Sequence, residues 1–426
     1  MRIVTILLLV FLLNTVQAQK RSLDFYISKA TAFSPLINQA QNENSIVGLD
    51  LELMKSILTK PEINVDANVL FAPIISHNNN KNRFEPVSDG AANYNGYDLA
   101  VTDGGQYQSV ISLKQPLFAG SNFNTYANKA AVSRQINDTR IALTTHDLEK
   151  VISHQYILCL KAKRSADINV ELLKELEEQL QIMQRLVENA IYKQSDLMLM
   201  QIELENYKLN YVASLSEFKN NLFDLNLLCG IKDTTSVDLQ EIDPQLKNIT
   251  TVSSEFLNSF RLDSLNIYSE QQISDLKYKP QVNFFADAGL NAVYLPTINR
   301  LGFSTGLNLS WNIFDGHQQK IQKQKSAVNL LSLDFEKQNF ISQQKINKNN
   351  IRNQIASLNN RILLTDSQLD KYDQLLKVYH VQLTQGEISV IDFKNILKDI
   401  AAKKQDRLML AMEKQALIIS FNYWNY

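Results

Sequence analysis

The sequence predicts an α+β membrane protein built from a duplicated unit, in which a β-hairpin is followed by a long α-helical hairpin. Three observations support this fold class. Only 12 Gly and 8 Pro occur in 426 residues, and neither occurs in 121–229, while 317–426 contains only Gly386. The two halves of the chain match at one fixed offset, and two stretches with a strand-like alternation of apolar and polar residues precede each glycine-poor segment.

The first eighteen residues predict a signal peptide. Arg2 precedes the apolar run 3–13, and Val16-Gln17-Ala18 supplies the small residues of a cleavage site. The predicted mature chain therefore begins near Gln19 and is exported. The apolar run is too short to span a bilayer, and no run of about 18 apolar residues occurs elsewhere, so we expect any membrane crossing to be made by strands.

Composition argues against several classes of function. The 43 Lys and Arg residues balance 44 Asp and Glu residues, which gives no electrostatic basis for binding nucleic acid. Cys159 and Cys229 each follow a leucine in apolar, helix-like sequence, as expected for buried thiols rather than a disulfide framework. We find no metal-ligand spacing, Gly-rich phosphate loop or nucleophile elbow. The sequence predicts a protein that is not an enzyme and has no cofactor or metal site.

The internal repeat has an offset of 196 residues. At this offset Pro116–Gly120 matches Asn312–Gly316. Five apolar positions spaced by 3, 4, 3 and 4 residues recur at the same offset, as Leu173, Leu176, Leu180, Met183 and Val187, and as Leu369, Tyr372, Leu376, Tyr379 and Leu383. One register held over this distance indicates duplication, and the heptad spacing predicts left-handed helix packing.

The element order follows from these patterns. Residues 19–230 are the first repeat, with a short helix, two strands and a long helical hairpin, and 231–253 form an irregular connecting segment. Residues 254–426 are the second repeat. We expect long helices from about Ser121 and His317 to turns near residues 190 and 386, with return helices at 194–228 and 388–421.

Period-two alternation predicts four strands. They lie at 63–71, near 111–117, at 282–290 and at 303–313, and the polar stretch 77–105 between the first two predicts an exposed loop. In the last strand Leu307, Leu309 and Trp311 alternate with Asn308, Ser310 and Asn312. We predict that these three apolar residues face lipid on a barrel, whereas a soluble sandwich core is the alternative explanation of the same alternation.

Four strands cannot close a barrel, because backbone groups at an open edge have no partner in lipid and the smallest barrels have eight strands. Two copies would supply eight strands, which leave little room for a conduit, and three copies would supply twelve. The sequence therefore predicts a trimer with a 12-stranded β-barrel. Helices of about 70 residues extend on the order of 100 Å and need neighbours on both sides, so an α-helical coiled-coil barrel is expected to continue the β-barrel.

At four segments the sequence resembles the TolC-like outer-membrane efflux protein family. These are Gln115–Gly120, Trp311–Gly316, Tyr278–Val282 and Gln385–Phe393, and the resemblance covers nearly the whole mature chain. It implies a homotrimer in the lipid of the cell outer membrane that extends into the periplasm. It also implies a passive conduit of a tripartite efflux or type I secretion system, with a periplasmic adaptor (membrane fusion) protein and an inner-membrane pump as partners. A periplasmic adaptor and a structural coiled-coil protein are the alternatives.

By this resemblance, the turns of the two helical hairpins dock the adaptor or gate the conduit. The residues concerned are Ser195, Asp196, Gly386, Glu387, Ser389 and Asp392. The first turn lacks the glycine that Gly386 provides in the second, so docking there is expected to differ in detail. Two roles remain open for Asp196, Glu387 and Asp392, namely a carboxylate ring that favours cations and ordinary helix capping.

Overall fold

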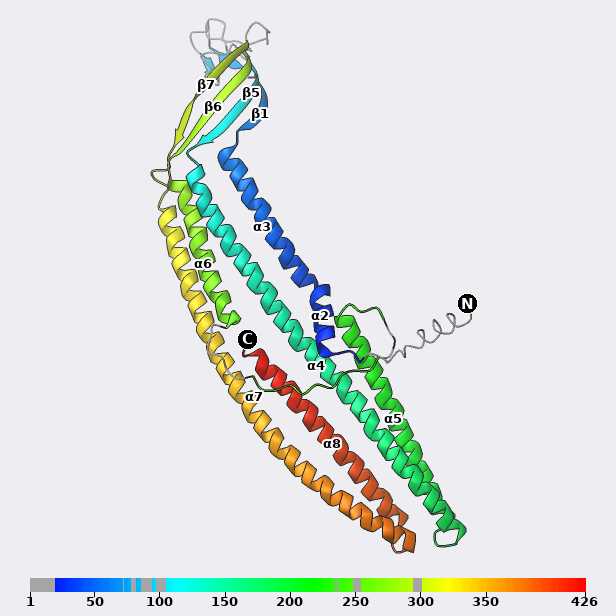
Figure 1. The fold of residues 1–426 in the computed structure, drawn as a ribbon. Coiled ribbons are helices and arrows are strands. Elements are labelled where there is room, and N and C mark those ends of the chain that lie inside the picture. Colours follow the sequence, from blue (N-terminus) through cyan, green and yellow to red (C-terminus); the bar gives the residue numbers. More distant parts are fainter. Residues whose placement is uncertain are drawn as a thin grey trace, which may run out of the picture. The chain divides into compact units, whose positions relative to one another are not determined.

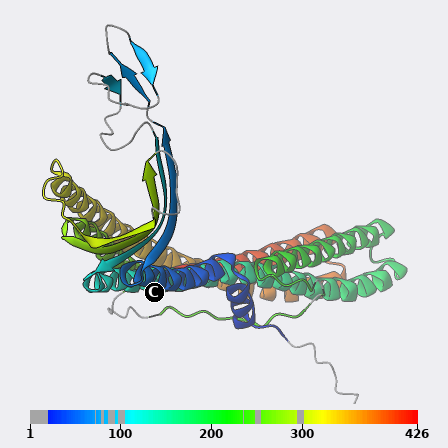
Figure 2. The ribbon, with the colours of Figure 1, turned by 90° about the horizontal axis from the view of Figure 1, so that it is seen from above.

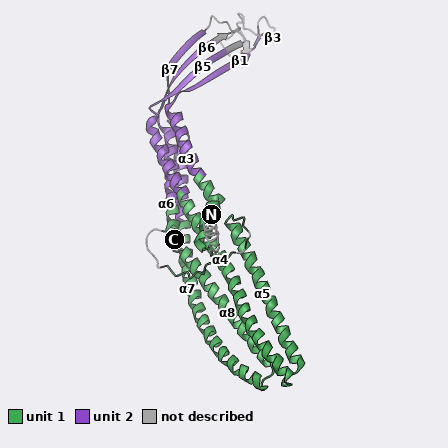
Figure 3. Cartoon of the chain, turned by 45° about the vertical axis from the view of Figure 1, so that its right-hand side comes forward, with its two compact units in different colours: residues 1–41, 138–259, 335–426 green, residues 42–137, 260–334 purple. Residues whose placement is uncertain are grey.

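The computed structural model describes residues 20–71, 73–77, 82–85, 94–96, 105–233, 235, 237–247, 254–293 and 301–426. The predicted signal peptide, 1–18, lies outside the described residues. The chain divides into two compact units (Figure 3), of which unit 1 comprises Met1–Gln41, Asp138–Ser259 and Phe335–Tyr426, and unit 2 comprises Asn42–Asn137 and Phe260–Asp334.

Helices and strands follow the order that the repeat predicts (Figure 1). The helices are α2 (Leu23–Phe33), α3 (Pro35–Thr59), α4 (Gly120–Glu188), α5 (Gln194–Leu228), α6 (Glu255–Asp275), the 3-10 turn η2 (Leu276–Tyr278), α7 (Gln318–Gln385) and α8 (Val390–Tyr423). The strands are β1 (Glu62–Phe71), β2 (Ile74–Ser76), β3 (Arg83–Glu85), β4 (Tyr94–Gly96), β5 (Gly105–Leu117), β6 (Gln281–Val293) and β7 (Leu301–Ser310). No helix in the described part of the chain is both long and apolar enough to cross a membrane.

The first repeat begins with two helices, where the sequence predicted one short helix. The break falls at Ser34, whose hydroxyl accepts a hydrogen bond from the backbone N–H of Ile37 at 3.4 Å. Pro35 then occupies the first position of α3, where its missing N–H costs no helical hydrogen bond. Ser34 and Pro35 together end one helix and start the next.

Unit 2 contains a four-stranded antiparallel sheet with the order β1-β5-β6-β7. Its strands curve along their length (Figure 2). Among the described residues, β1 and β7 are the edge strands, so the sheet of one chain is open. A second sheet has the order β3-β2-β4. The stretch 77–105, predicted as an exposed loop, contains the short strands β3 and β4, which pair with β2 and which the sequence did not predict.

Strand β7 differs from its prediction at both ends. It begins at Leu301 and stops at Ser310, whereas alternation suggested 303–313. Trp311 follows the strand, and its indole N–H donates to the backbone carbonyl of Tyr278 at 3.2 Å. Alternation alone could not mark the end, because apolar and polar residues continue to alternate through Ile313 after the pairing with β6 has ended.

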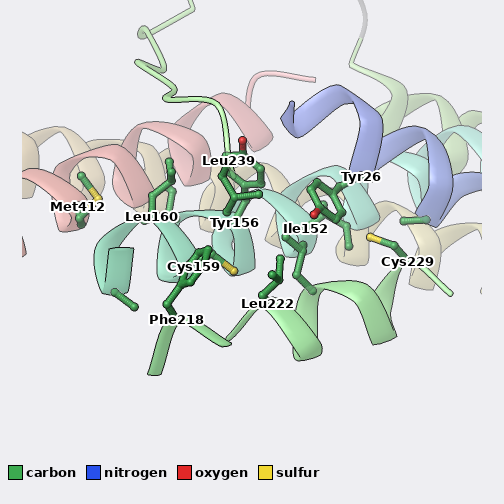
Figure 4. Close-up of a cluster of buried hydrophobic side chains, with 14 of the residues drawn as sticks. Tyr26, Ile152, Tyr156, Cys159, Leu160, Phe218, Leu222, Cys229, Leu239 and Met412 are labelled. Carbon is green, nitrogen blue, oxygen red and sulfur yellow. The ribbon is translucent and has the colours of Figure 1, made fainter. Parts of the chain in front are cut away.

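Unit 1 is a helical body whose buried apolar residues form three clusters, the smallest of which joins α7 and α8 through Ile351, Ile355, Ile418 and Phe421. The equatorial cluster gathers α2, α4, α5, α8 and the segment 231–247 (Figure 4), and comprises Tyr26, Ala30, Ile152, Tyr156, Ile157, Cys159, Leu160, Ala162, Phe218, Leu222, Leu225, Cys229, Leu239, Leu408 and Met412. The tip cluster comprises Leu172, Leu176, Met183, Leu197, Met200, Leu204, Tyr207, Leu383, Val390, Phe393 and Leu397. The predicted heptad positions are all buried or half-buried.

The two thiols lie in the equatorial cluster as predicted. Cys159 and Cys229 are buried and unoxidised, and burial raises the pKa of each thiol to about 12. A thiol with so high a pKa is protonated at neutral pH and therefore unreactive. Both side chains act as small apolar residues in this core.

The predicted irregular segment crosses the equatorial cluster without a helix or extended strand in its described residues. Leu239 forms a single parallel bridge with Arg21, which donates its backbone N–H to Asp238 and accepts from Gln240. The fully buried Tyr156 places its hydroxyl 2.9 Å from the carbonyl of Arg21 and 2.7 Å from that of Gln240. These bonds satisfy backbone groups that the extended segment would otherwise leave unpaired beside an apolar core.

Candidate functional site: hairpin tips and amphipathic sheet

The first hairpin tip is a tight turn between α4 and α5. Ala190 has a φ of +58°, and its N–H bonds to the carbonyl of Val187 while the N–H of Ile191 bonds to that of Leu186. This is the Schellman pattern that ends helices, here with alanine in the left-handed position usually taken by glycine. Asp196 accepts the backbone N–H of Lys193 at 3.0 Å, which fixes the start of α5. Ser195 is exposed.

The second tip has the same type of turn, with glycine in the left-handed position and serine as the N-cap residue. Gly386 has a φ of +75°, and the N–H groups of Gly386 and Glu387 bond back to Leu383 and Gln382. Ser389 caps α8 by accepting the N–H of Asp392 at 3.1 Å, and its hydroxyl donates to the Asp392 carboxylate at 2.6 Å. Gly386, Glu387, Ser389 and Asp392 are all exposed.

The two tips contact each other. The hydroxyl of Tyr192 donates to the carbonyl of Ile388 at 2.7 Å. A side-chain carbon placed on Gly386 would lie 2.9 Å from Cγ2 of Ile191, closer than ordinary packing allows. The six predicted tip residues are therefore brought to one end of unit 1, above the tip cluster.

Sequence reasoning did not single out Ala190, and it placed Ile191 and Tyr192 in the first turn without giving them a role. The repeat offset could have found the first, because it maps Ala190 onto Gly386 and so marks it as a left-handed position. It also maps Tyr192 onto Ile388, so the hydrogen bond between tips joins equivalent positions of the two repeats. Although the first turn lacks glycine, its backbone has the same hydrogen-bond pattern and the same positive φ as the second, and the expected difference in docking stays a prediction.

Both tip aspartates take part in helix caps. Asp196 and Asp392 are the acidic residues in the first turns of α5 and α8, and they occupy equivalent positions of the repeat. The Asp196 carboxylate accepts a backbone N–H, and the Asp392 carboxylate accepts the hydroxyl of the N-cap Ser389. A carboxylate in the first turn also interacts favourably with the positive end of the helix dipole. Helix capping is thus sufficient to explain the two aspartates. It does not explain Glu387, the third acidic residue of the predicted tip set.

A further link between the hairpins lies behind the tips. His380 on α7 is 3.2 Å from the carboxylate of Glu175 on α4, and its ring stacks edge-on against Phe393 of α8. The hydrogen bond from His380 lowers the pKa of Glu175, although partial burial opposes this shift. Lys404 on α8 adds a contact of 3.6 Å to Glu171.

The four-stranded sheet has one apolar and one polar face. Val65, Ile111, Ala288 and Phe303 stand opposite one another across all four strands, as do the residues of the adjacent polar row, Asn64, Ser112, Asp287 and Ser304. Leu307 and Leu309 lie on the apolar face and are 68% and 67% exposed. Trp311 is also exposed, but it lies beyond the strand. The apolar face is thus uncovered in the single chain.

The polar face carries a shallow hollow of about 490 Å³ lined by side chains of all four strands. Asp66 and Asp287 line it, beside Gly289 and Gly302. Lys114 lies opposite Glu62 in the register of β1 and β5. This face presents the hydrogen-bonding and charged groups that suit water rather than lipid.

Among the described residues, no group of three or more His, Cys, Asp or Glu side chains is placed to hold a metal ion. His146 and His154 make separate contacts, the former to the carbonyl of Tyr423 at 2.9 Å and the latter to the hydroxyl of Ser420 at 3.1 Å.

Comparisons with known proteins identify the fold. No protein-family model matches the sequence, and no curated protein is similar to it in sequence. Solved structures do match. The outer membrane protein VceC from Vibrio cholerae superposes with a TM-score of 0.70 at 11% identity, covering 95% of both chains. A membrane protein from Pseudomonas aeruginosa gives 0.69 at 11% identity, covering 95% of this chain and 90% of that one.

CusC, whose structures are described in terms of folding and transmembrane channel formation, superposes with a TM-score of 0.67 at 11% identity. The match covers 96% of this chain and 92% of the CusC chain. These proteins are described as membrane proteins or channels and not as enzymes. At such low identity the likeness concerns the fold, which extends over nearly the whole chain. The resemblance that the sequence suggested is confirmed at this level: the chain has the fold of the TolC-like outer-membrane efflux channels.

Proposed function

We propose that this protein is the outer-membrane channel of a tripartite efflux or type I secretion system. Three copies would form a twelve-stranded barrel across the outer membrane, continued through the periplasm by a tube of helices. The conduit would be passive, with energy supplied by an inner-membrane pump that a periplasmic adaptor connects to it.

One observation carries this proposal: the four-stranded sheet exposes its mainly apolar face, and in the described part of the chain its two edge strands, β1 and β7, each lack a partner on one side. An exposed apolar surface of this kind is unfavourable in water, and an open edge is unfavourable in lipid. Both problems disappear when copies of the chain join edge to edge in a membrane. The matching structures described as outer-membrane channels support the same conclusion.

The two alternatives explain less of the molecule. A periplasmic adaptor uses a single helical hairpin, whereas this chain has two, α4–α5 and α7–α8, each preceded by its own strand pair. A structural coiled coil has no use for an amphipathic sheet. Neither alternative requires the apolar residues of β7 to be exposed.

The hairpin tips are the proposed docking site for the adaptor. Ser195, Glu387 and Ser389 are exposed there, and the cluster beneath them holds the turns in a defined position. A photo-crosslinking amino acid at position 387 is expected to capture the adaptor in cells. The same group at Glu336, an exposed glutamate of α7 far from the tip in sequence, is the matched control and should capture none.

Mass and shape of the detergent-extracted protein test the channel itself. Light scattering should give three times the chain mass, and negative-stain images should show a stain-filled channel along the particle axis. A monomer or dimer that stays soluble without detergent would contradict the proposal and favour an adaptor or a coiled coil.

Paired lysine substitutions test which face meets lipid. Leu307→Lys places a charge on the apolar face and should weaken membrane insertion by about 2–4 kcal/mol if the site lies near the bilayer midplane. Asn308→Lys changes the adjacent residue on the polar face and should have little effect. Liposome flotation measures both, and equal losses would show that the two faces do not have the proposed environments.

A further inference from the structure

The two edge strands of the sheet have equal length and compatible faces. β1 and β7 each contain ten residues. Odd-numbered residues of both strands lie on the apolar face, since Val65 and Phe303 belong to one row of opposed residues. When two copies pair through these edges, odd residues must therefore oppose odd residues, because a slip of one residue would turn every side chain to the wrong face.

The sheet itself contains a stagger that limits the register further. Glu62, the first residue of β1, lies in one row with Lys114, Phe285 and Gly306. β7 continues four residues past Gly306 and ends at Ser310. At this end of the sheet, β7 therefore extends four residues beyond the row in which β1 begins.

We propose that β7 of one copy pairs antiparallel with β1 of the next in the register that places Ser310 opposite Glu62 and Leu301 opposite Phe71. This inference rests on the proposed function and adds the residue-level contact between copies. All ten residues of each strand find a partner. Leu307 then faces Val65 among apolar residues, and Asn308 faces Asn64 on the polar face.

Barrel geometry favours the same register. A displacement of four residues per copy gives a shear of twelve residues for three copies. With a rise of about 3.4 Å per residue and about 4.8 Å between strands, this shear tilts twelve strands by about 35°, within the range of about 35–45° seen in barrels. Registers slipped by two residues would give tilts of about 20° or 47° and would leave two residues of each edge unpaired.

Cysteine pairs test the register directly. In the double variant Asn64→Cys, Asn308→Cys, the two Cα atoms on adjacent copies would lie about 4.5–5.5 Å apart, a separation that a disulfide can bridge. Within one chain the same residues are separated by β5 and β6, about 14 Å across the strands, and by four further residues along β7, so any disulfide must join two copies. Val65→Cys with Leu307→Cys repeats the test on the apolar face, where the alternate type of strand pair occurs.

The matched control is Asn64→Cys with Ser310→Cys, which is slipped by two residues and would place the Cα atoms about 7–8 Å apart. Single-cysteine variants control for the buried Cys159 and Cys229. After mild oxidation, the in-register pairs should give a covalent trimer on a non-reducing gel, and the slipped pair should give at least tenfold less.

The outcomes separate the two proposals. A trimer by light scattering in which only the slipped pair cross-links, or in which neither in-register pair does, would overturn the register and leave the channel intact. A monomeric protein without cross-links would overturn the proposed function as well.

Discussion

The two long helices α4 and α7 correspond to each other at the repeat offset, yet the chain buries them very differently. Sixteen of the 69 residues of α4 are buried, against five of the 68 in α7. The fully buried Tyr156 of α4 corresponds at the repeat offset to the exposed Arg352 of α7. Large apolar residues such as Leu331, Leu363 and Val381 remain exposed on α7.

The return helices show no such divergence. Leu204 and Leu225 of α5 correspond to Ile400 and Phe421 of α8, and all four are buried. The contrast indicates that α4 is the central helix of the folded chain. α7 instead keeps exposed apolar side chains, which need to be covered from outside the single chain. Neighbouring copies in the proposed trimer would supply that cover.

The largest effect is expected from truncating the core of α4. Leu160→Ala removes a fully buried side chain from the equatorial cluster and should lower the free energy of unfolding by about 2–5 kcal/mol. Urea unfolding followed by circular dichroism measures this loss. The repeat supplies a natural comparison, because α7 already carries Ala356 at the equivalent position; a loss below about 1 kcal/mol would mean that α4 is not the central helix.

A charge on α7 should affect assembly rather than folding. Leu363 is 67% exposed in the single chain, so an aspartate at this position stays in water there. In Leu363→Asp the charge becomes costly only when another copy covers and buries it. We expect helix content to be unchanged and the trimer to dissociate at a protein concentration at least tenfold higher than for the parent protein. Asn353→Asp, at an exposed polar position of α7, is the control. Unaltered assembly of the Leu363 variant would remove this site from the interface.

The tips should respond with opposite signs to exchange of their left-handed residues. Gly386→Ala introduces a side chain at a φ of +75° and against Ile191, and should destabilise the turn by about 1–2 kcal/mol. Ala190→Gly relieves the same conformation in the first tip and should stabilise it by less than about 1 kcal/mol, because added glycine freedom in the unfolded chain offsets part of the gain. Thermal unfolding of both variants measures the difference, and a shared sign would contradict the equivalence of the turns.

The link between α4 and α7 behind the tips gives the smallest effect, and it depends on pH. The pKa of Glu175 is lowered by the hydrogen bond from His380, so its contribution to stability is present above its unfolded pKa and is lost as pH falls through the lower folded value. Glu175→Gln should therefore cost about 0.2–1 kcal/mol near pH 7, since the pair is partly exposed, and nothing once the pH has fallen below the lowered folded pKa. Glu177→Gln, at an exposed neighbouring position, should show no such pH dependence.

Most of the fold was predictable because it depends on local signals. Two segments without helix-breaking residues set the bounds of α4, α5, α7 and α8 to within a few residues, and alternation located the four strands of the large sheet. The heptad positions were predicted from spacing, and all are buried or half-buried, with Met183 and Leu383 fully buried. The errors fall where local pattern and pairing disagree, as at Trp311, or where a proline divides a helix, as at Pro35.

The tip residues were predictable as positions but not as contacts. The sequence located Asp196 and Asp392 at helix starts, and the cap chemistry follows from that placement. The bond from Tyr192 to Ile388 depends on two turns nearly 200 residues apart arriving side by side, which no local pattern encodes.

The sequence by itself thus determined the duplication, the long helices, the amphipathic strands and the apolar positions, because backbone propensity and side-chain period act over a few residues. Tertiary structure alone decided which copy of the duplicated helix is buried, where β7 stops and which strands form the edges of the sheet. These features depend on which surfaces remain after packing, and that is settled by contacts between residues far apart in the chain.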